Sequence, residues 1–305
     1  MNDLEEHKIK DKNKPYLNHK NAVLSAPIRH LFMIATVEYL KKEKNTDFID
    51  VLEIGSWFGA STLSWGQGLS LYFDNKSSIT CIDAWEPFFD MEVHDKKDYA
   101  LEMENLLESN FAYEAFLHNI GILQEKINIK HIKGKSEVIL PQIKEKQYDI
   151  IFIDADHTYN PVKTDIYNSL KLLKEGGIIC GDDLNLQMHE IDNIFAKKNR
   201  DKDFINDPKT KKNYHPGVTL AVHEFFGNVS SWGGFWGMQR KEQKYNKYSL
   251  KNMSLVYPTH FTDEHRKKAE SHFLDIKDHD KQTIQAILAA GHKIKKNRKE
   301  LLYFV

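Results

Sequence analysis

Five short apolar runs alternate with helix-like stretches, and this alternation constrains the fold more than any other feature. The runs cover residues 48–54, 79–82, 127–132, 150–153 and 178–180. Nearly continuous apolar runs of this length suit strands that are buried on both faces, as in a parallel sheet. Helical patterns cover residues 60–73, 99–120, 137–146 and 161–174, the last closed by Gly176 and Gly177. The alternation predicts an α/β fold with a doubly wound, mostly parallel sheet.

Additional segments flank this alternating region. Helical spacing predicts a helix over residues 25–44, with Ser25 as its cap and Pro27 in its first turn. A polar stretch after residue 184 is expected to be a loop or lid, followed by a helix near 218–226. The aromatic residues that follow suit the core of a strand: Trp232, Phe235 and Trp236. We therefore expect an N-terminal extension (1–24), a main domain (25–240) and a C-terminal helical extension (241–305) in which Ile284, Ile287 and Leu288 form one apolar face.

Composition excludes several classes of protein. Forty-three basic and 44 acidic residues leave a net charge of −1, so a globally basic nucleic-acid binder is not expected. A hydrophobic share of 41% is typical of a globular chain and argues against disorder. The sequence shows neither an apolar run of about 18 residues nor a signal peptide at its start, so we expect a cytoplasmic protein with no membrane contact. Cys81 and Cys180 lie in apolar runs, where buried free thiols are expected rather than a disulfide.

The residues that follow the predicted strands are the first candidates for a functional site. Ligands of an open parallel sheet bind beyond the carboxyl ends of its strands. Each of these ends carries a glycine or an acid. In chain order the candidates are Glu53, Gly55, Ser56, Gly59, Ser61, Asp83, Ser136, Asp154, Asp156, His157, Asp182 and Asp183.

The first of these ends is a glycine loop of the form E-x-G-x-x-x-G, starting at Glu53. Its glycines allow the backbone to approach a ligand and leave amide groups free at the next helix, although a tight turn explains them equally well. The loop lacks the G-x-G-x-x-G spacing of dinucleotide-binding proteins, so we do not expect a nicotinamide cofactor. Asp83 stands where an acid can accept ribose hydroxyls, or it caps a helix.

The fourth and fifth strand ends carry acids that we expect to converge. Asp154, Asp182 and Asp183 follow neighbouring strands and have no obvious cationic partner in the sequence. Like charges at one place favour raised pKa values or a bound cation, and oxygen ligands favour magnesium or calcium. The alternative is that these acids cap turns or helices.

Six runs of sequence together resemble the class I S-adenosylmethionine-dependent methyltransferases, and most closely the metal-dependent O-methyltransferases of sugar and natural-product hydroxyls. The resemblance spans roughly residues 25–237. The runs are VLEIGSWFGAST, ITCIDAW, IKGKSEVI, YDIIFIDADHTYNPVKTDI, LLKEGGIICGDD and HPGVTLAVHEFFG. The resemblance implies a Rossmann-like fold, S-adenosylmethionine as cofactor, and Mg²⁺ or another divalent cation.

The resemblance also implies roles for the candidate residues. Glu53, Gly55 and Gly59 would line the methionine part of the cofactor, Asp83 would hold its ribose, and Ser136 would lie near its adenine. The same cofactor site would include Ser56, Ser61 and Asp154, while a divalent ion would be held by Asp154, Asp182 and Asp183. His157 is the expected general base, because an imidazole with a pKa near 6.5 can be neutral at cytosolic pH. Asp156 is the competing base.

The resulting hypothesis is a magnesium-dependent O-methyltransferase that acts on a hydroxyl of a sugar, a glycan precursor or a related small molecule. Two alternatives remain open: a metal-dependent hydrolase that uses the same acids, and a non-catalytic cofactor-binding protein. The expected partner is a small-molecule or saccharide acceptor, and the C-terminal extension could support a homo-oligomer.

Overall fold

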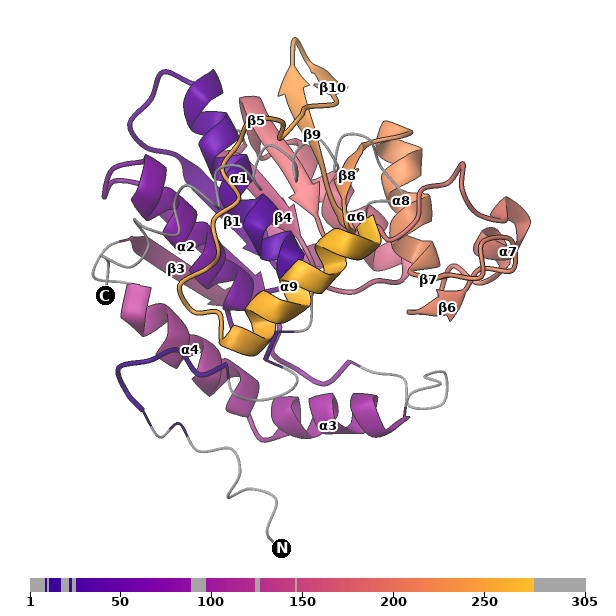
Figure 1. Cartoon of the computed structure of the whole chain (residues 1–305), viewed down its shortest axis with the longest axis horizontal. Helices are drawn as coiled ribbons and strands as arrows, with labels where there is room; N and C mark the ends of the chain where they lie inside the picture. Colours follow the sequence, from indigo (N-terminus) through magenta and orange to yellow (C-terminus); the bar gives the residue numbers. More distant parts are fainter. Residues whose placement is uncertain are drawn as a thin grey trace, which may run out of the picture.

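The computed structural model describes residues 9, 11–17, 22–23, 26–88, 97–123, 127–145 and 147–276. These residues form an eight-stranded sheet in the order β10-β9-β5-β4-β1-β2-β3, with β8 paired to β9 (Figure 1). The strands are β1 (Asp50–Ile54), β2 (Ser78–Asp83), β3 (Asn128–Lys133), β4 (Tyr148–Ile153), β5 (Leu173–Gly181), β8 (Ser230–Trp232), β9 (Phe235–Lys241) and β10 (Lys244–Asn246).

Strands β1 to β5 pair with one another in parallel, as the buried apolar runs predicted. Strand β1 lies between β2 and β4, so the strand order reverses at β1 and β4, as in the Rossmann order 3-2-1-4-5. The prediction of a doubly wound, mostly parallel sheet is therefore confirmed. The reversal point is also where ligands bind in such folds.

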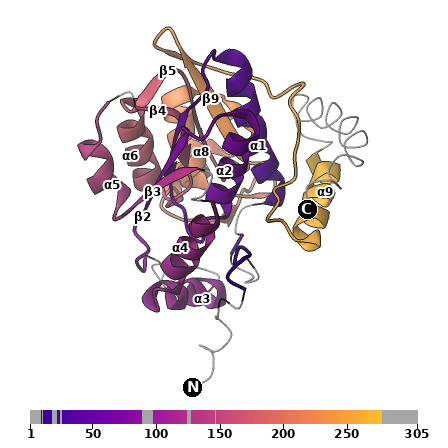
Figure 2. The ribbon, with the colours of Figure 1, turned by 90° about the vertical axis from the view of Figure 1, so that its left-hand side faces the viewer.

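Helices cover both faces of the sheet. Figure 2 shows α1 (Pro27–Glu43) and α2 (Ala60–Tyr72) on one face and α5 (Ser136–Ile139) and α6 (Tyr159–Leu170) on the other. Successive strand residues enter different cores: Val51 joins the cluster with α1 and α2, whereas Leu52 joins the cluster with α6. Burial on both faces explains why the strands read as continuous apolar runs. The other helices are α3 (Lys97–Glu108), α4 (Phe111–Leu123), α7 (Asn193–Lys198), α8 (Pro216–Phe226) and α9 (Asp263–Ile276).

The aromatic segment after α8 belongs to the core, as predicted. Trp232, Phe235 and Trp236 are at most 1% exposed, and β9 pairs antiparallel with β5. The two cysteines are buried free thiols, again as predicted. Among the described residues, no helix has the length and apolar character needed to span a bilayer.

Three helix predictions were wrong in extent. The stretch 99–120 forms two helices, α3 and α4, separated at Asn110, whose φ is 61°. The stretch 137–146 forms only α5 and a short 3₁₀ turn over Leu140–Gln142. The stretch 161–174 ends as a helix at Leu170, because β5 already begins at Leu173. Gly176 and Gly177 therefore lie inside a strand, next to an irregularity in the β4–β5 pairing.

The flanking segments agree with the predictions in part. Helix α1 spans most of the predicted range, but Ser25 lies outside the described residues and Ala26 takes the N-cap position without a side-chain cap. The polar stretch expected to be a loop contains part of α7 and a hairpin of β6 (Ile205–Asn206) and β7 (Asn213–Tyr214). Helix α9 contacts α1. Ile284, Ile287 and Leu288 lie outside the described residues, and the three domain boundaries remain predictions.

Candidate functional site

The β1 end approaches the β4 end so closely that only glycine fits at position 55. Gly55 has a φ of 86°, and a Cβ added to it would lie 2.0 Å from the carbonyl oxygen of Asp154. The amide of Asp154 also donates to the carbonyl oxygen of Ile54 at 2.8 Å. Gly59, at the N-cap of α2, has a φ of 84°. The loop between these glycines is therefore held at the point where the strand order reverses.

The side chain of Glu53 holds this loop through hydrogen bonds to its hydroxyl groups. Its side chain is fully buried, and its Oε2 accepts hydrogen bonds from the hydroxyls of Ser56, at 2.8 Å, and Thr62. Ser61 also hydrogen-bonds to this carboxyl, whose pKa is raised by burial. Among the described residues, Glu53 Oε1 has no hydrogen-bond partner. The predicted cofactor residues Glu53, Ser56 and Ser61 are thus brought together.

Asp83, at the end of β2, holds the same loop through hydrogen bonds from its backbone amides. Its Oδ2 accepts from the backbone amides of Ser56 (2.9 Å) and Trp57 (2.8 Å), and its Oδ1 accepts from the amide of Trp85 at 2.8 Å. Burial raises the pKa of this carboxyl, although these hydrogen bonds oppose the rise. The Ala84 backbone amide also hydrogen-bonds to this carboxyl, so these four amides use most of its acceptor positions.

Ser136 lies at the first position of α5, after the β3 end. Its hydroxyl hydrogen-bonds to Asp165 on α6, whose pKa is raised to about 7, mainly by burial. The connection to the glycine loop runs through Gly134, whose amide donates to the carbonyl oxygen of Asp83 at 2.8 Å. The Ser136 side chain takes no part in the hydrogen bonds described above for the glycine loop.

Asp156 stabilises the start of α6. Its Oδ1 accepts from both the backbone amide and the hydroxyl of Thr158, at 2.6 Å each. Thr158 is the N-cap residue of α6, so this carboxylate fixes the start of that helix. These contacts disfavour Asp156 as the general base.

The acids after β5 have a cationic partner, so the sequence-based premise that they have none was wrong. Nη1 of Arg29, on α1, lies 2.7 Å from Oδ1 of Asp182 and 2.7 Å from Oδ1 of Asp183. Burial opposes ionisation of Arg29, but the two carboxylates raise its pKa above the ordinary value. Asp182 is buried, with its pKa raised to about 8 by burial, and its Oδ2 has no partner among the described residues.

The imidazole of His157 lies between the carboxylates of Asp203, Asp183 and Asp154. Its Nδ1 lies 2.8 Å from Oδ1 of Asp203, and its Nε2 lies 3.1 Å from Oδ2 of Asp183 and 3.9 Å from Oδ1 of Asp154. Burial lowers the pKa of this imidazole, but Asp183 and the other acids raise it well above 6.5. The expectation of a neutral histidine with an ordinary pKa is thus wrong for the protein without a cation.

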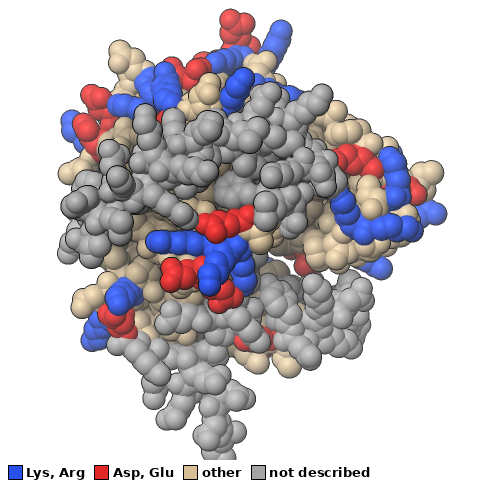
Figure 3. All heavy atoms as spheres, in the orientation of Figure 1, with Lys and Arg blue, Asp and Glu red and all other residues tan. Residues whose placement is uncertain are grey.

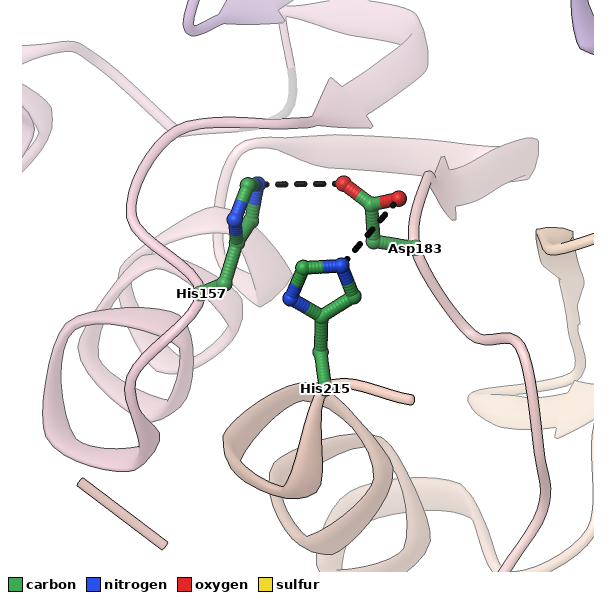
Figure 4. Close-up of side chains that lie close together, drawn as sticks. All are labelled: His157, Asp183 and His215. Atoms are coloured by element: carbon green, nitrogen blue, oxygen red, sulfur yellow. Dashed lines mark ion pairs between the residues drawn. The ribbon is translucent and has the colours of Figure 1, made fainter. Parts of the chain in front are cut away.

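A second histidine completes the cluster. His215, the N-cap of α8, lies with its Nδ1 3.0 Å from Oδ1 of Asp203 and its Nε2 3.6 Å from Oδ1 of Asp183. The two imidazole rings are 4.5 Å apart. Figure 4 shows the rings of His157 and His215 both turned toward the carboxylate of Asp183, each joined to it by an ion pair. His157, Asp183 and His215 each offer one ligand atom within 4.8 Å of the others.

The donor set fits a divalent cation, but not in the predicted arrangement. Two of the three predicted carboxylates, Asp182 and Asp183, share the guanidinium of Arg29. The described side chains that could close around an ion are instead two imidazoles and one carboxylate.

Three important residues escaped prediction. Arg29 lies on a helix that was recognised only by its apolar spacing, and Asp203 lies in the polar stretch assigned to a loop or lid. His215 opens the run HPGVTLAVHEFFG, which contributed to the resemblance, but a lone histidine before a helix carries no chemical signal of its own.

Lysines gather near the β6–β7 hairpin. Lys209, Lys211 and Lys212 are exposed. Figure 3 shows Lys and Arg side chains gathered on this side of the molecule, near the α7 end, with acidic side chains beside them.

Comparison with known proteins identifies the central part of the chain. Residues 52–184, which include β1, β2, β4 and β5 with their ends, match the family described as a methyltransferase domain. No curated protein matches the chain.

Solved structures with some likeness include a TDP-rhamnose 3′-O-methyltransferase of calicheamicin biosynthesis, at 13% identity over 68% of this chain and 78% of that chain (TM-score 0.37). An O-methyltransferase from Bacillus cereus in complex with SAH is 22% identical over 69% and 78% (TM-score 0.38). A putative caffeoyl-CoA O-methyltransferase from Staphylococcus aureus is 16% identical over 69% and 82% (TM-score 0.39). Likenesses this weak add nothing to the assignment, which rests on the family match and the strand order.

Proposed function

We propose that this protein is a class I, S-adenosylmethionine-dependent methyltransferase that methylates a hydroxyl group of a sugar, a glycan precursor or a related small molecule, with the help of a divalent cation. The match of residues 52–184 to a methyltransferase-domain family supports this proposal. One observation carries the proposal: the glycine loop at Gly55 and the cluster of acids and histidines around Asp183 lie at the same edge of the sheet, at the ends of β1, β4 and β5. The choice of a hydroxyl acceptor rests on the resemblance of the six sequence runs.

The loop side of the site suits the cofactor. When bound, S-adenosylmethionine supplies a methyl group on a positively charged sulfur. Gly55 lets the backbone turn without a side chain, and Glu53 and Asp83 hold the loop through hydroxyls and backbone amides. Asp83 stands at the end of β2, where an acid can accept a ribose hydroxyl in folds of this kind.

The residues Asp154, Asp183 and His157 form the acidic side of the site, which suits the methyl acceptor. An alcohol is a weak acid, and its oxygen must lose a proton before or during methyl transfer. When bound, a divalent cation lowers the pKa of such a hydroxyl. Asp154 and Asp183 supply negative charge there. His157 acts beside the hydroxyl, either by accepting its proton or by holding the cation, whereas Asp156 holds Thr158 at the start of α6.

The proposal is tested with radiolabelled S-adenosylmethionine and a panel of acceptors that includes nucleotide-linked sugars, free sugars and catechols, with Mg²⁺, with Mn²⁺ and in excess chelator. We expect a labelled O-methyl product that requires a cation. Transfer only to nitrogen or carbon acceptors would refute the hydroxyl assignment. Full turnover in chelator, with metal analysis showing none left, would remove the cation from the mechanism.

Two variants test the roles of His157 and Asp156 in methyl transfer. His157→Ala should lower the transfer rate about 100- to 10,000-fold, whereas Asp156→Asn should stay near the parent once folding is checked. A protein that binds S-adenosylmethionine but methylates none of the acceptors would instead be the non-catalytic binding protein. The hydrolase alternative is not favoured, because the domain is that of a methyltransferase.

A further inference from the structure

We propose that His157, His215 and Asp183 bind a divalent transition-metal ion, and that Asp203 orients the two histidines for this purpose. The site deepens the proposed function, because it assigns ligands and a metal class to the cation that the function invokes. Its role in methyl transfer rests on that function, whereas metal binding itself does not.

The ligand atoms come from three separate elements and meet at one point. His157 follows β4, Asp183 follows β5 and His215 caps α8 (Figure 4). The two Nε2 atoms face different oxygens of Asp183, at 3.1 Å and 3.6 Å. Two imidazoles and one carboxylate are a common ligand set for divalent transition metals, and they leave coordination positions open for other ligands.

Asp203 sets which ring nitrogen of each histidine faces the site. Its Oδ1 lies 2.8 Å from Nδ1 of His157 and 3.0 Å from Nδ1 of His215. An ionised carboxylate only accepts hydrogen bonds, so each Nδ1 carries a proton and the Nε2 of each ring is turned toward Asp183. A carboxylate behind the ring is the usual support of a metal-binding histidine. Both Nε2 atoms are thus placed to bind a cation together with Asp183.

The backbone is shaped to bring the two histidines together. A Cβ added to Gly217 would lie 2.3 Å from the carbonyl oxygen of His157 and 2.5 Å from the amide nitrogen of Tyr159. The start of α8 can therefore pack against the β4–α6 loop only with glycine at this position. Asp183 adopts a left-handed φ of 61° where it enters the site. Both features put the three ligand atoms within 4.8 Å of one another.

The donor types decide the class of metal. Magnesium prefers oxygen ligands, whereas imidazole suits zinc, iron, copper and nickel. The oxygen-rich alternative, Asp154 with Asp182 and Asp183, needs both carboxylates that share Arg29, whereas the proposed set needs only Asp183, whose Oδ2 faces His157 while its Oδ1 pairs with Arg29. The site therefore favours a transition-metal ion over Mg²⁺.

The test uses the full chain after treatment with a chelator. Calorimetric titrations with Zn²⁺, Mn²⁺ and Mg²⁺, and a Co²⁺ titration followed by visible absorption, measure affinity and ligand type. We expect one Zn²⁺ or Co²⁺ ion per chain, bound at least about 100-fold more tightly than Mg²⁺, with a Co²⁺ spectrum that indicates nitrogen ligands. His215→Ala should weaken binding about 100-fold or more, and Asp203→Asn about 10- to 100-fold.

His223→Ala is the matched control, because this histidine is exposed on the same helix and should leave binding unchanged. Thermal unfolding checks each variant, and His215→Gln replaces His215→Ala if the latter is unfolded. Three results would overturn the proposal: no binding of Zn²⁺ or Co²⁺ by the parent, equally tight binding of Mg²⁺, or unchanged affinity in the folded His215 variant.

The same preparations separate this proposal from the proposed function. Loss of metal affinity in His215→Ala supports the site even if no acceptor is methylated, which would refute only the function. Cation-dependent methyl transfer with unchanged metal affinity in His215→Ala would refute only the site.

Discussion

Gly55 and Asp154 belong to different strand ends, yet a Cβ on Gly55 would lie 2.0 Å from the carbonyl oxygen of Asp154. The cofactor loop and the acidic side of the site are therefore in direct backbone contact. A small change in the backbone at the end of β1 must therefore displace the backbone at the end of β4.

Gly55→Ala should strongly destabilise the protein or prevent folding, because the methyl group meets backbone and the φ of 86° is unfavourable for alanine. Gly121→Ala is the control. Gly121 lies in α4 with no atom within 4 Å of an added Cβ, so this change should stabilise by up to about 1 kcal/mol. Urea denaturation measures both. A Gly55→Ala protein as stable as the parent would show that the two ends are not packed as described.

Arg29→Leu should lower the free energy of unfolding by about 3 to 5 kcal/mol, because it removes the buried guanidinium that Asp182 and Asp183 share and leaves the Asp182 carboxyl buried without it. Adding Asp182→Asn should restore part of the loss, since a neutral amide needs no counter-charge. Arg266→Leu, at an exposed site on α9, is the control. Chemical denaturation provides the values, and equal effects of Arg29→Leu and Arg266→Leu would contradict the buried pairing.

Asp83→Ala should weaken binding of S-adenosylhomocysteine by about 1.5 to 3 kcal/mol. The variant loses a ribose acceptor and also the carboxylate that holds the amides of Ser56 and Trp57. Asp47→Ala, whose side chain is 81% exposed, serves as the control. Calorimetric titration measures affinity, and NAD should bind to neither variant nor parent. Unchanged affinity would exclude Asp83 from the site.

Asp165→Asn should make the protein relatively more stable at high pH. The folded-state pKa of Asp165 is raised to about 7 by burial and by the charges of Glu137 and Asp156, against the Ser136 hydrogen bond. A carboxyl with a raised pKa contributes stability that is present below about pH 4 and is lost as pH rises through 7.

The unfolding free energy of Asp165→Asn relative to the parent should therefore increase by about 2 to 3 kcal/mol between pH 5 and pH 8. Asp74→Asn, at an exposed position, should show no such trend. Parallel pH profiles for Asp165→Asn and the parent would mean that Asp165 titrates normally.

Local sequence was enough to predict the strands and the residues at their ends. The apolar runs mark β1, β2, β4 and β5 because burial on both faces leaves little polar alternation, whereas the edge strand β3 is largely exposed. Parallel strands put all their carboxyl ends at one edge. The meeting of Glu53, Ser56 and Asp83 follows from that rule alone. Their actual partners, which are hydroxyls and amides of the loop itself, required coordinates.

The sequence could not reveal contacts that depend on packing between distant segments. Arg29 reaches Asp183 across 154 positions, and His157 reaches Asp203 across 46. Nothing near Arg29 or Asp203 in the sequence marks them as partners of a strand end. The helix that was expected to continue to residue 174 ends at Leu170, because Leu173 pairs with Tyr148 of β4 and starts β5.

Arg29 also donates from Nε to the carbonyl oxygen of Gly233 at 2.8 Å, across 204 positions. During synthesis on the ribosome, this guanidinium is made early, and its last partner emerges roughly 10 to 40 s later at typical elongation rates. Until then the nascent chain cannot bury Arg29 with all its partners. Prematurely terminated products that stop before the β8–β9 hairpin therefore carry an incompletely paired cation at the core, and we expect cellular proteases to remove them.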